Sequence, residues 1–108
     1  MQWSAKEKGE NELLIKFSWP QSGKYLVKAN VLPVKAGGKF QIFLNEEPLS
    51  SALDLHSETD DPTVKLIDLG TTKLKGGENT VRFKYLEDQS QGRRLSVDYL
   101  QFQSLMEN

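Results

Sequence analysis

The sequence predicts an all-β domain, an antiparallel β-sandwich of about eight strands with little or no helix. Three observations support this prediction. Apolar and polar residues alternate with a period of two along most of the 108-residue chain, as they do in strands that bury one face. Turn-forming residues interrupt these stretches about every 8–12 residues, which is the spacing of sandwich strands. No long stretch keeps the 3.6-residue period of an amphipathic helix.

The composition is that of one ordinary globular domain. Hydrophobic residues make up 37% of the chain and charged residues 27%, which argues against disorder. The net charge is −1, so no strong field attracts nucleic acid, and no run approaches the roughly 20 apolar residues of a membrane span. The absence of cysteine excludes a disulfide and a zinc–thiolate site. We therefore expect neither a nucleic-acid partner nor membrane insertion.

The two ends of the sequence indicate a module. The N-terminal stretch MQWSAKEKGENE lacks the apolar segment of a signal peptide. Trp3, a residue typical of folded structure, lies close to the first residue, and the last predicted strand stops shortly before the last. We interpret residues 1–108 as a single β-sandwich module that was excised from a larger multidomain protein.

The first three predicted strands alternate most clearly. Turns separate them at 20–23 and 35–38, where glycine allows positive φ and proline fixes φ at about −65°. A third turn, Asn-Glu-Glu-Pro, follows at 45–48. The inward rows are Leu13, Ile15, Phe17 and Trp19 in ELLIKFSW (12–19); Tyr25, Val27, Ala29 and Val31 in GKYLVKANVL (23–32); and Phe40, Ile42 and Leu44 in GKFQIFLN (38–45).

The middle of the chain has two weaker strand candidates, PLSSALDL (48–55) and VKLIDLGTTKL (64–74). A long polar loop, HSETDDPT (56–63), separates them. A tight KGGEN connection leads into NTVRFKYL (79–86), which has Val81, Phe83 and Tyr85 on one face. The predicted core is made of Leu13, Ile15, Phe17, Tyr25, Val27, Val31, Phe40, Ile42, Leu44, Leu66, Val81, Phe83, Leu95 and Val97.

The last predicted strand, RRLSVDYLQF (93–102), changes face part-way. Leu95 and Val97 share one parity, whereas Leu100 and Phe102 share the other. A strand covered on both sides would show this pattern, and so would a β-bulge that re-aims the end of the strand. We place the change at residues 98–99.

The order of these turn and core residues is similar to a known pattern. FSWPQSGKYLVKANV and GGKFQIFLNEEPL are followed by LDLHS, then by Leu69-Gly70, by Leu74 with Gly76-Gly77 and Asn79-Thr80, and by Val97-Asp98-Tyr99-Leu100. Over about residues 10–103 this order resembles the galactose-binding-like β-sandwiches. These include carbohydrate-binding module families 6 and 35 and related accessory domains of bacterial multidomain proteins. The resemblance implies a jelly-roll topology and a role in carbohydrate binding.

The resemblance also raises the question of a structural calcium. Members of the two families often open with a short acidic motif that holds calcium together with an aspartate of the last strand. Asp98 matches that aspartate, but the chain opens with Met-Gln-Trp-Ser and lacks the motif. Asp98, with Glu10 and Glu12, is therefore a candidate for calcium, and the alternative is that Asp98 accepts backbone hydrogen bonds. We expect no other cofactor.

Catalytic patterns are weak in this sequence. The single histidine, His56, stands beside Ser57 and Glu58, but adjacent residues rarely assemble a triad, so a loop or packing role is expected. Glu58, Asp60 and Asp61 could supply paired carboxylates, although acidic residues before a proline are typical of a solvated turn. We predict that the chain is not an enzyme.

Sugar recognition needs an aromatic plane for stacking and polar side chains that bind hydroxyl groups. The polar loop LEDQSQGRR (86–94) offers acids, amides and guanidinium groups, and its alternative interpretation is a plain polar hairpin loop. The candidate ligand-binding residues are Trp3, Tyr85, Asp88, Gln91, Arg93 and Arg94.

The function predicted from these observations is a non-catalytic, carbohydrate-binding-like accessory module of a bacterial secreted or surface protein. The alternative is a structural or protein-interaction spacer domain without a sugar site. The expected partners are a carbohydrate and neighbouring domains of the same polypeptide. An extracellular, periplasmic or cell-surface location is implied by the resemblance alone.

Overall fold

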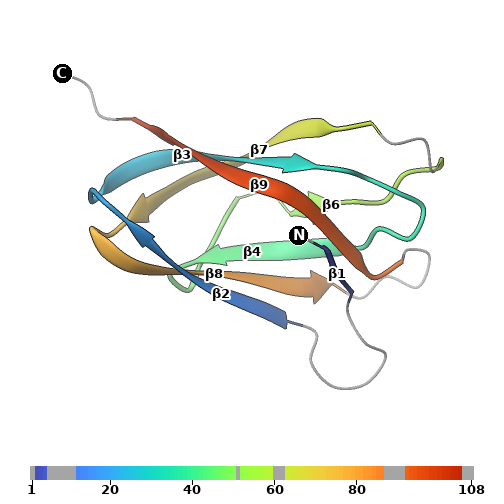
Figure 1. Ribbon diagram of the computed structural model, residues 1–108, viewed down its shortest axis with the longest axis horizontal. Helices are drawn as coiled ribbons and strands as arrows, with labels where there is room; N and C mark the ends of the chain where they lie inside the picture. Colours follow the sequence, from blue (N-terminus) through green and yellow to red (C-terminus); the bar gives the residue numbers. More distant parts are fainter. Residues whose placement is uncertain (1, 5–11, 51, 60–62, 87–91, 106–108) are drawn as a thin grey trace.

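The computed structural model describes residues 2–4, 12–50, 52–59, 63–86 and 92–105. These residues form two antiparallel β-sheets packed face to face, and no helix occurs among them (Figure 1). In the described part of the chain, therefore, no helix is long and apolar enough to cross a membrane. The predicted all-β sandwich is confirmed.

Most successive strands of the chain alternate between the two sheets. From β2 to β4 and again from β7 to β9, successive strands lie in opposite sheets, which is the crossing pattern of a jelly roll. The four-stranded sheet has the order β1 (Gln2–Ser4), β9 (Arg94–Ser104), β3 (Gly23–Val31), β7 (Lys65–Leu74). The five-stranded sheet has the order β2 (Glu12–Trp19), β8 (Gly77–Leu86), β4 (Lys39–Leu44), β5 (Glu47–Pro48), and β6 (Leu53–Asp54) also pairs with β4.

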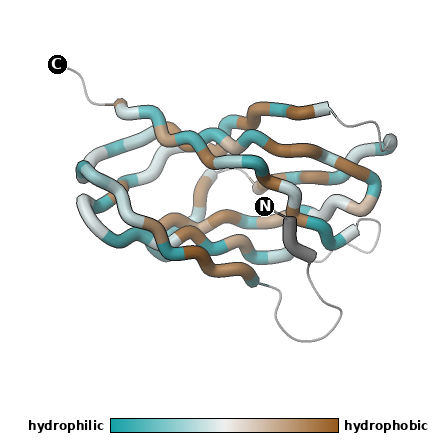
Figure 2. The backbone as a smooth tube through the Cα atoms, viewed as in Figure 1, coloured by the Kyte–Doolittle hydropathy of each residue, from teal (hydrophilic) through white to brown (hydrophobic). Residues whose placement is uncertain are grey.

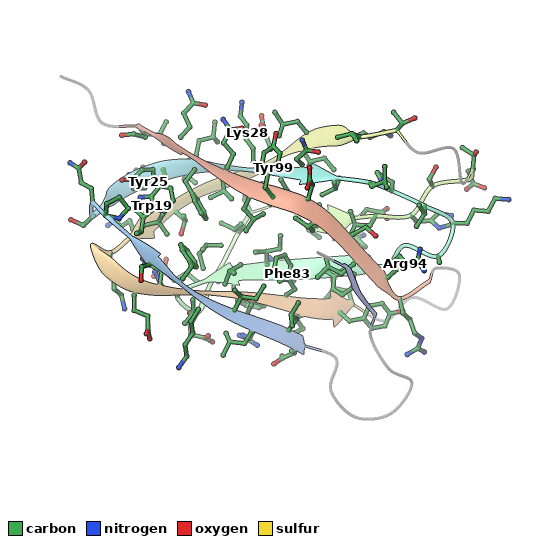
Figure 3. All side chains as sticks on the ribbon, in the orientation of Figure 1. Trp19, Tyr25, Lys28, Phe83, Arg94 and Tyr99 are labelled. Carbon is green, nitrogen blue, oxygen red and sulfur yellow. The ribbon has the colours of Figure 1, made fainter. Side chains whose placement is uncertain are left out.

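The core lies between the sheets, where the apolar rows of both meet (Figure 2). Most of the predicted core is confirmed; Phe83, for example, points between the sheets (Figure 3). Three predicted members on β2 are only half-buried but pack against the core: Leu13, Ile15 and Phe17. The segment 48–55 adds three buried leucines that the sequence pattern did not single out: Leu49, Leu53 and Leu55.

A bulge in β7 moves Leu66 out of the core. Two successive residues of β3 pair with Gly70 and Asp68, so Leu69 is an extra residue in this ladder. Even-numbered residues face inward after the bulge and odd-numbered residues before it. The prediction of Leu66 as a core residue is therefore wrong: its side chain faces outward and the residue is 52% exposed.

A second bulge lies in β9, at the place where the sequence changes face. Val97 pairs with Val31, whereas Tyr99 pairs with Asn30, the adjacent residue of β3, so Asp98 is the extra residue. The apolar residues that follow return to the core side. The change of face predicted at residues 98–99 is confirmed, and of its two possible causes the structure shows the bulge. The Asp98 carboxylate is exposed and has no hydrogen-bond partner among the described residues.

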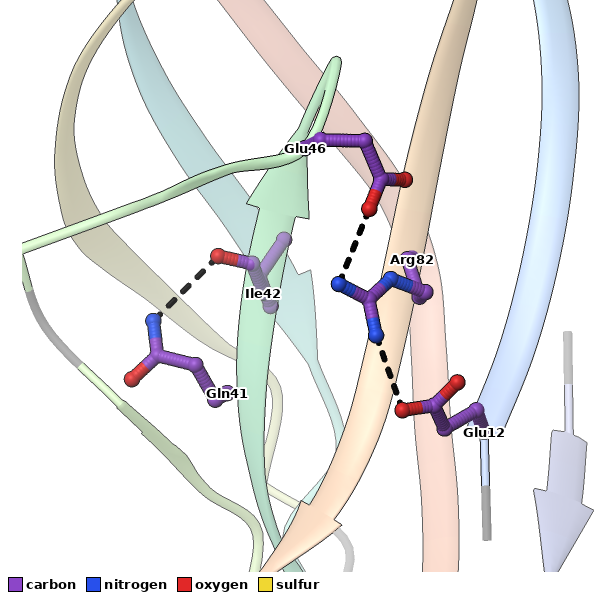
Figure 4. A network of polar contacts seen from close by, with 5 residues as sticks. All are labelled: Glu12, Gln41, Ile42, Glu46 and Arg82. Atoms are coloured by element: carbon purple, nitrogen blue, oxygen red, sulfur yellow. Dashed lines mark hydrogen bonds and ion pairs between the residues drawn. The ribbon is translucent and has the colours of Figure 1, made fainter. Parts of the chain in front are cut away.

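Arg82 organises the outer face of the five-stranded sheet (Figure 4). Its guanidinium donates to Glu12 over 2.8 Å and to Glu46 over 3.0 Å, which ties β2 and the β4–β5 turn to β8. Its Cζ atom also lies 4.2 Å from the centroid of the Phe43 ring, a cation–π contact. Arg82 thus covers the ring, which is not presented as a free aromatic plane.

Candidate functional site

One end of the sandwich gathers three connections: β3–β4, β6–β7 and β8–β9 (the right-hand end in Figure 1). Backbone hydrogen bonds join the described parts of these loops to one another, so the end is a single platform rather than separate loops. The bonds run from Val34 N to Leu55 O (3.1 Å), from Ser57 N to Val34 O (3.0 Å), from Arg94 N to Ala36 O (2.9 Å) and from Gly38 N to Arg94 O (3.0 Å).

Glycines allow this close approach of one loop to another. A Cβ atom on Gly37 would overlap the carbonyl of Leu55, and a Cβ atom on Gly92 would overlap the carbonyl of Ala36. Backbone lies against backbone at both places, so no flexible side chain can give way. The platform is consequently fixed by these glycines and by the hydrogen bonds between the loops.

Tyr85 supports this platform from below. The residue is 6% exposed, its ring packs against Phe40 at 5.5 Å between centroids, and its hydroxyl donates to Gly92 O over 3.2 Å. The ring of Tyr85, a predicted ligand-binding residue, is therefore not exposed for stacking against a sugar. Its position on the central strand β8 directs the ring into the core. Its hydroxyl instead holds Gly92, shortly before the start of β9.

Two of the predicted binding residues reach the end of the sandwich. The Cζ atom of Arg93 lies 5.5 Å from the centroid of the Tyr85 ring, and Nη1 is buried without a hydrogen-bond partner among the described residues. Arg94 is exposed, and its side chain extends away from the start of β9 (Figure 3). These guanidinium groups can donate several hydrogen bonds to hydroxyl or carboxylate oxygens.

The other predicted binding residues are placed less fully. Trp3 lies opposite Leu95 in the β1–β9 ladder, but its side chain is outside what the structure describes. Asp88 and Gln91 also lie outside the described residues. Their roles stay predictions.

His56 lies at the same end and is held by its neighbours. Its backbone N–H donates to the Asp54 carboxylate over 3.0 Å, and its Nδ1 atom lies 3.1 Å from the carbonyl oxygen of Lys35. A carbonyl only accepts, so Nδ1 carries the proton in this contact. Its Nε2 atom faces the Glu58 carboxylate at 3.7 Å. These contacts give His56 a positional role in the loop; the sequence pattern could not show that Lys35 is its partner.

A calcium site around Asp98 has little support from the geometry. No group of three or more His, Cys, Asp or Glu side chains that could hold a metal ion lies within the described ranges. Of the other two candidates, Glu12 is paired with Arg82, and Glu10 lies outside the described residues. The described side chains therefore do not fit a calcium ion, and a contribution from Glu10 stays a prediction.

The structure reveals a further polar pocket that the sequence did not predict. It has a volume of about 240 Å³ and lies on the outer face of the four-stranded sheet, beside the β9 bulge. Asn30, Ser96 and Asp98 supply its polar side chains, and Leu32 and Val64 are among its apolar lining residues. Tyr99, which is 47% exposed, faces Asn30 directly across the strands. The bulge leaves both Asp98 and Tyr99 exposed. The change of face in the sequence at these residues is therefore the feature that could have predicted this pocket.

No family model and no curated protein matches the chain. Solved structures do share its fold. A family 35 carbohydrate-binding module from an environmental isolate has a TM-score of 0.62 and 12% identity, with 91% of this chain and 72% of the module covered. A family 35 module from Clostridium thermocellum has a TM-score of 0.56 and 20% identity, with coverage of 86% and 69%.

A region of the xanthan lyase of Paenibacillus is also similar, with a TM-score of 0.74 and 23% identity. The match covers 86% of this chain but spans only 9% of the lyase. The resemblance to family 6 stays a prediction. The chain has the β-sandwich fold of family 35 carbohydrate-binding modules.

Proposed function

We propose that the chain is a non-catalytic carbohydrate-binding module of a larger secreted or surface protein of bacterial origin. The observation that carries this proposal is the fold that the chain shares with two carbohydrate-binding modules. The match covers most of the length of each module. The match to a small part of a xanthan lyase is consistent with an accessory role beside a larger partner. Fold alone does not decide function, so the proposal depends on the loop end as well.

The proposed binding surface is the platform around Arg93 and Arg94. Arg94 offers exposed donors to sugar hydroxyls or carboxylates, and Arg93 is positioned by the Tyr85 ring. Because hydrogen bonds and glycine contacts already hold the described parts of these loops in place, those parts lose little conformational entropy when a ligand binds. We expect weak affinities, which a module can tolerate when it makes repeated contacts along a polymer.

A catalytic role has less support from this end of the sandwich. Glycoside hydrolysis needs two carboxyl groups facing each other across the bond that breaks. Of the described carboxylates here, Asp54 accepts the backbone N–H of His56, and the Glu58 side chain is 97% exposed. Both carboxylates contact His56, so they are accounted for as loop contacts, and any chemistry belongs to a partner domain in this proposal.

The second candidate function is a spacer or protein-interaction domain without a sugar site. The observation that favours it is the burial of Tyr85, which removes the expected stacking plane from the described part of the loop end. The exposed aromatic on the described surface is Tyr99, on the outer face of a sheet.

Affinity electrophoresis through gels containing plant, algal, bacterial and host polysaccharides tests the proposal, followed by calorimetry on any glycan that retards the protein. We expect Arg94→Ala to weaken binding about tenfold, since a hydrogen bond to a charged group contributes roughly 1.5–3 kcal/mol. Lys73→Ala, an exposed substitution on β7, is the matched control and should bind unchanged. If Tyr99→Ala abolishes binding and Arg94→Ala does not, the site lies on the outer face. No retardation by any glycan would leave the spacer function.

A further inference from the structure

The sandwich is open along one side. Apart from Ile67, the apolar side chains that pack against the core but stay partly exposed all lie on β2 and β9: Leu13, Ile15, Phe17, Trp19, Leu100 and Phe102. By contrast, the leucines of the segment between β5 and β7 are fully buried on the other side. Incomplete burial is thus confined to the side where β2 and the second half of β9 border the two sheets.

A groove of about 230 Å³ runs between these two borders. It is lined mainly by apolar residues of three strands: Ile15, Phe17, Val81, Phe83, Val97, Leu100 and Phe102. Asp98 and Tyr99 of β9 also line it. The Phe17 and Phe102 rings stack at 5.6 Å at one end. Such a lining offers few hydrogen-bond partners, so it suits aliphatic side chains better than a hydroxyl-rich sugar.

The border strand beside this groove has a free edge. β1 pairs with β9 only at residues 94–96, and no strand of the described chain pairs with that edge over residues 98–103. After the bulge at Asp98, residues 99–103 contain neither the proline nor the charged side chains that usually protect an edge from pairing with another chain. An apolar groove beside an unpaired edge is the arrangement that accepts an added strand.

β1 shows the line that such a strand would follow. Gln2 lies opposite Ser96 and Trp3 opposite Leu95, so β1 runs antiparallel to β9 and points its N-terminal end toward the bulge. A strand placed antiparallel on residues 98–103 would be collinear with β1, with its C-terminal end nearest Gln2. Its alternate side chains would then face the groove.

We propose that the free edge of β9, from Asp98 to Gln103, binds an extended strand of a partner polypeptide, in line with β1, whose alternate apolar side chains fill the groove. This interaction is independent of carbohydrate binding. A second copy of the chain fits less well, because the edge strands of a copy direct their apolar rows into their own core. The outward row of β2 offers only Leu14 beside Lys16 and Ser18.

The probe for this proposal is a short synthetic peptide of alternating valine and threonine with a lysine at each end, and serine replaces valine in the control peptide. We expect the valine peptide to shift the backbone amide signals of Tyr99 and Leu100 saturably in NMR spectra. The signals of β7, the other border of the same sheet, should not move. A spin label at the C-terminal end of the peptide should broaden the Asp98 signal, and one at the N-terminal end the Gln103 signal.

Matched variants test the groove itself. Ile15→Lys places a charge in the groove, whereas Leu14→Lys places the same charge on the outward face of the same strand. We expect Ile15→Lys to weaken peptide binding about tenfold or more, because the charge would lose water beside the apolar strand. Leu14→Lys should bind normally. Leu100→Ala, a milder change to the groove, provides the same test if Ile15→Lys does not fold.

Three results would overturn the proposal. Equal binding of the serine peptide would show that the groove does not select apolar side chains. Equal shifts along β7 would show that any strand edge suffices. Concentration-dependent self-association through β9, with no response to the peptide, would make a second copy the occupant.

Discussion

The side-chain amide of Asn45 donates a hydrogen bond to Oδ1 of Asn79 over 2.8 Å, and this contact joins the β4–β5 turn to the start of β8. The β4–β5 turn contains Asn45 with φ of 50°, a conformation that asparagine tolerates better than most residues. Asn79 lies near the start of β8, just after the β7–β8 turn, and is 1% exposed. The two asparagines therefore hold the end of the sandwich opposite the glycine platform.

Replacing Asn79 by alanine should destabilise the fold by about 2–4 kcal/mol, because it removes several hydrogen bonds of a buried side chain to partly buried backbone groups. Its Nδ2 atom donates to the carbonyls of Lys75 and Gly77, and its Oδ1 atom accepts from Lys75 N as well as from Asn45. Denaturant unfolding followed by circular dichroism measures the loss. A change of less than about 1 kcal/mol would show that water replaces these bonds.

Asn79→Asp should make stability depend on pH. An aspartate would place carboxylate oxygens against the carbonyls that Nδ2 now serves, so the ionised form is disfavoured in the folded state. The pKa of such a group is raised by folding, and the stability of the variant is therefore greatest below about pH 4 and falls as the pH rises. Melting temperatures of the variant and the parent chain at pH 4 and pH 7 provide the comparison. Equal losses at both values would contradict the argument.

Deleting Asp98 should be tolerated better than deleting a nearby residue. Val97 and Tyr99 pair with adjacent residues of β3, so removal of the extra residue leaves a continuous ladder with every following side chain on its present face. Deleting Gln101 instead turns Phe102 outward and separates it from Phe17 and Trp19, at a cost of about 2 kcal/mol. Chemical denaturation of the two deletion variants measures their free energies of unfolding, and equal losses would contradict this prediction. Asp98→Ala should change stability by less than about 0.5 kcal/mol, because its carboxylate is exposed.

Gly37→Ala should lower stability by about 2 kcal/mol or more, since the added Cβ atom meets the Leu55 carbonyl and the loops must separate. Gly76→Ala is the matched control. There the nearest atoms would lie 3.6 Å and 3.7 Å from the new Cβ, an ordinary contact distance. Thermal melts of both variants should differ clearly, and equal melting temperatures would mean that the platform is not as closely packed as described.

Arg82→Ala should cost about 1 kcal/mol. The two carboxylate partners are largely exposed, so each ion pair contributes little, and the contact with Phe43 adds a comparable amount. Raising the salt concentration should reduce the difference between variant and parent only in part, because the ring contact involves a half-buried surface. A cost that disappears completely in high salt would assign the whole effect to the ion pairs.

Period-two alternation was enough to predict both layers of the sandwich and most of its core, because each strand buries one face. It was also enough to locate the bulge in β9, where apolar residues occupy both sides of the change. It failed at Leu66 because the corresponding bulge in β7 is marked only by Leu69 and Gly70, and a parity shift within a short apolar stretch has no clear signature.

The candidate site was harder to predict than the fold. Arg93 and Arg94 were proposed because a polar loop carries them, and their binding role stays a prediction. Tyr85 was proposed as well, although its parity assigns its ring to the core, where the structure places it. The contact of His56 with Lys35 joins loops 21 residues apart, and no local pattern encodes it. Contacts between residues of different loops depend on the topology, so the residue pattern within a single strand or loop does not predict them.

The strand order has a consequence for how the chain reaches its folded state. Every ladder of the four-stranded sheet joins strands that are far apart in sequence, so β3 has no partner in its own sheet until residues 65–74 have been synthesised. Closing such long loops precedes any gain from pairing, and domains of this kind fold in about milliseconds to seconds. During synthesis on the ribosome, the apolar row of β3 would stay uncovered for a large part of the chain, which makes the nascent first half a natural client for a chaperone.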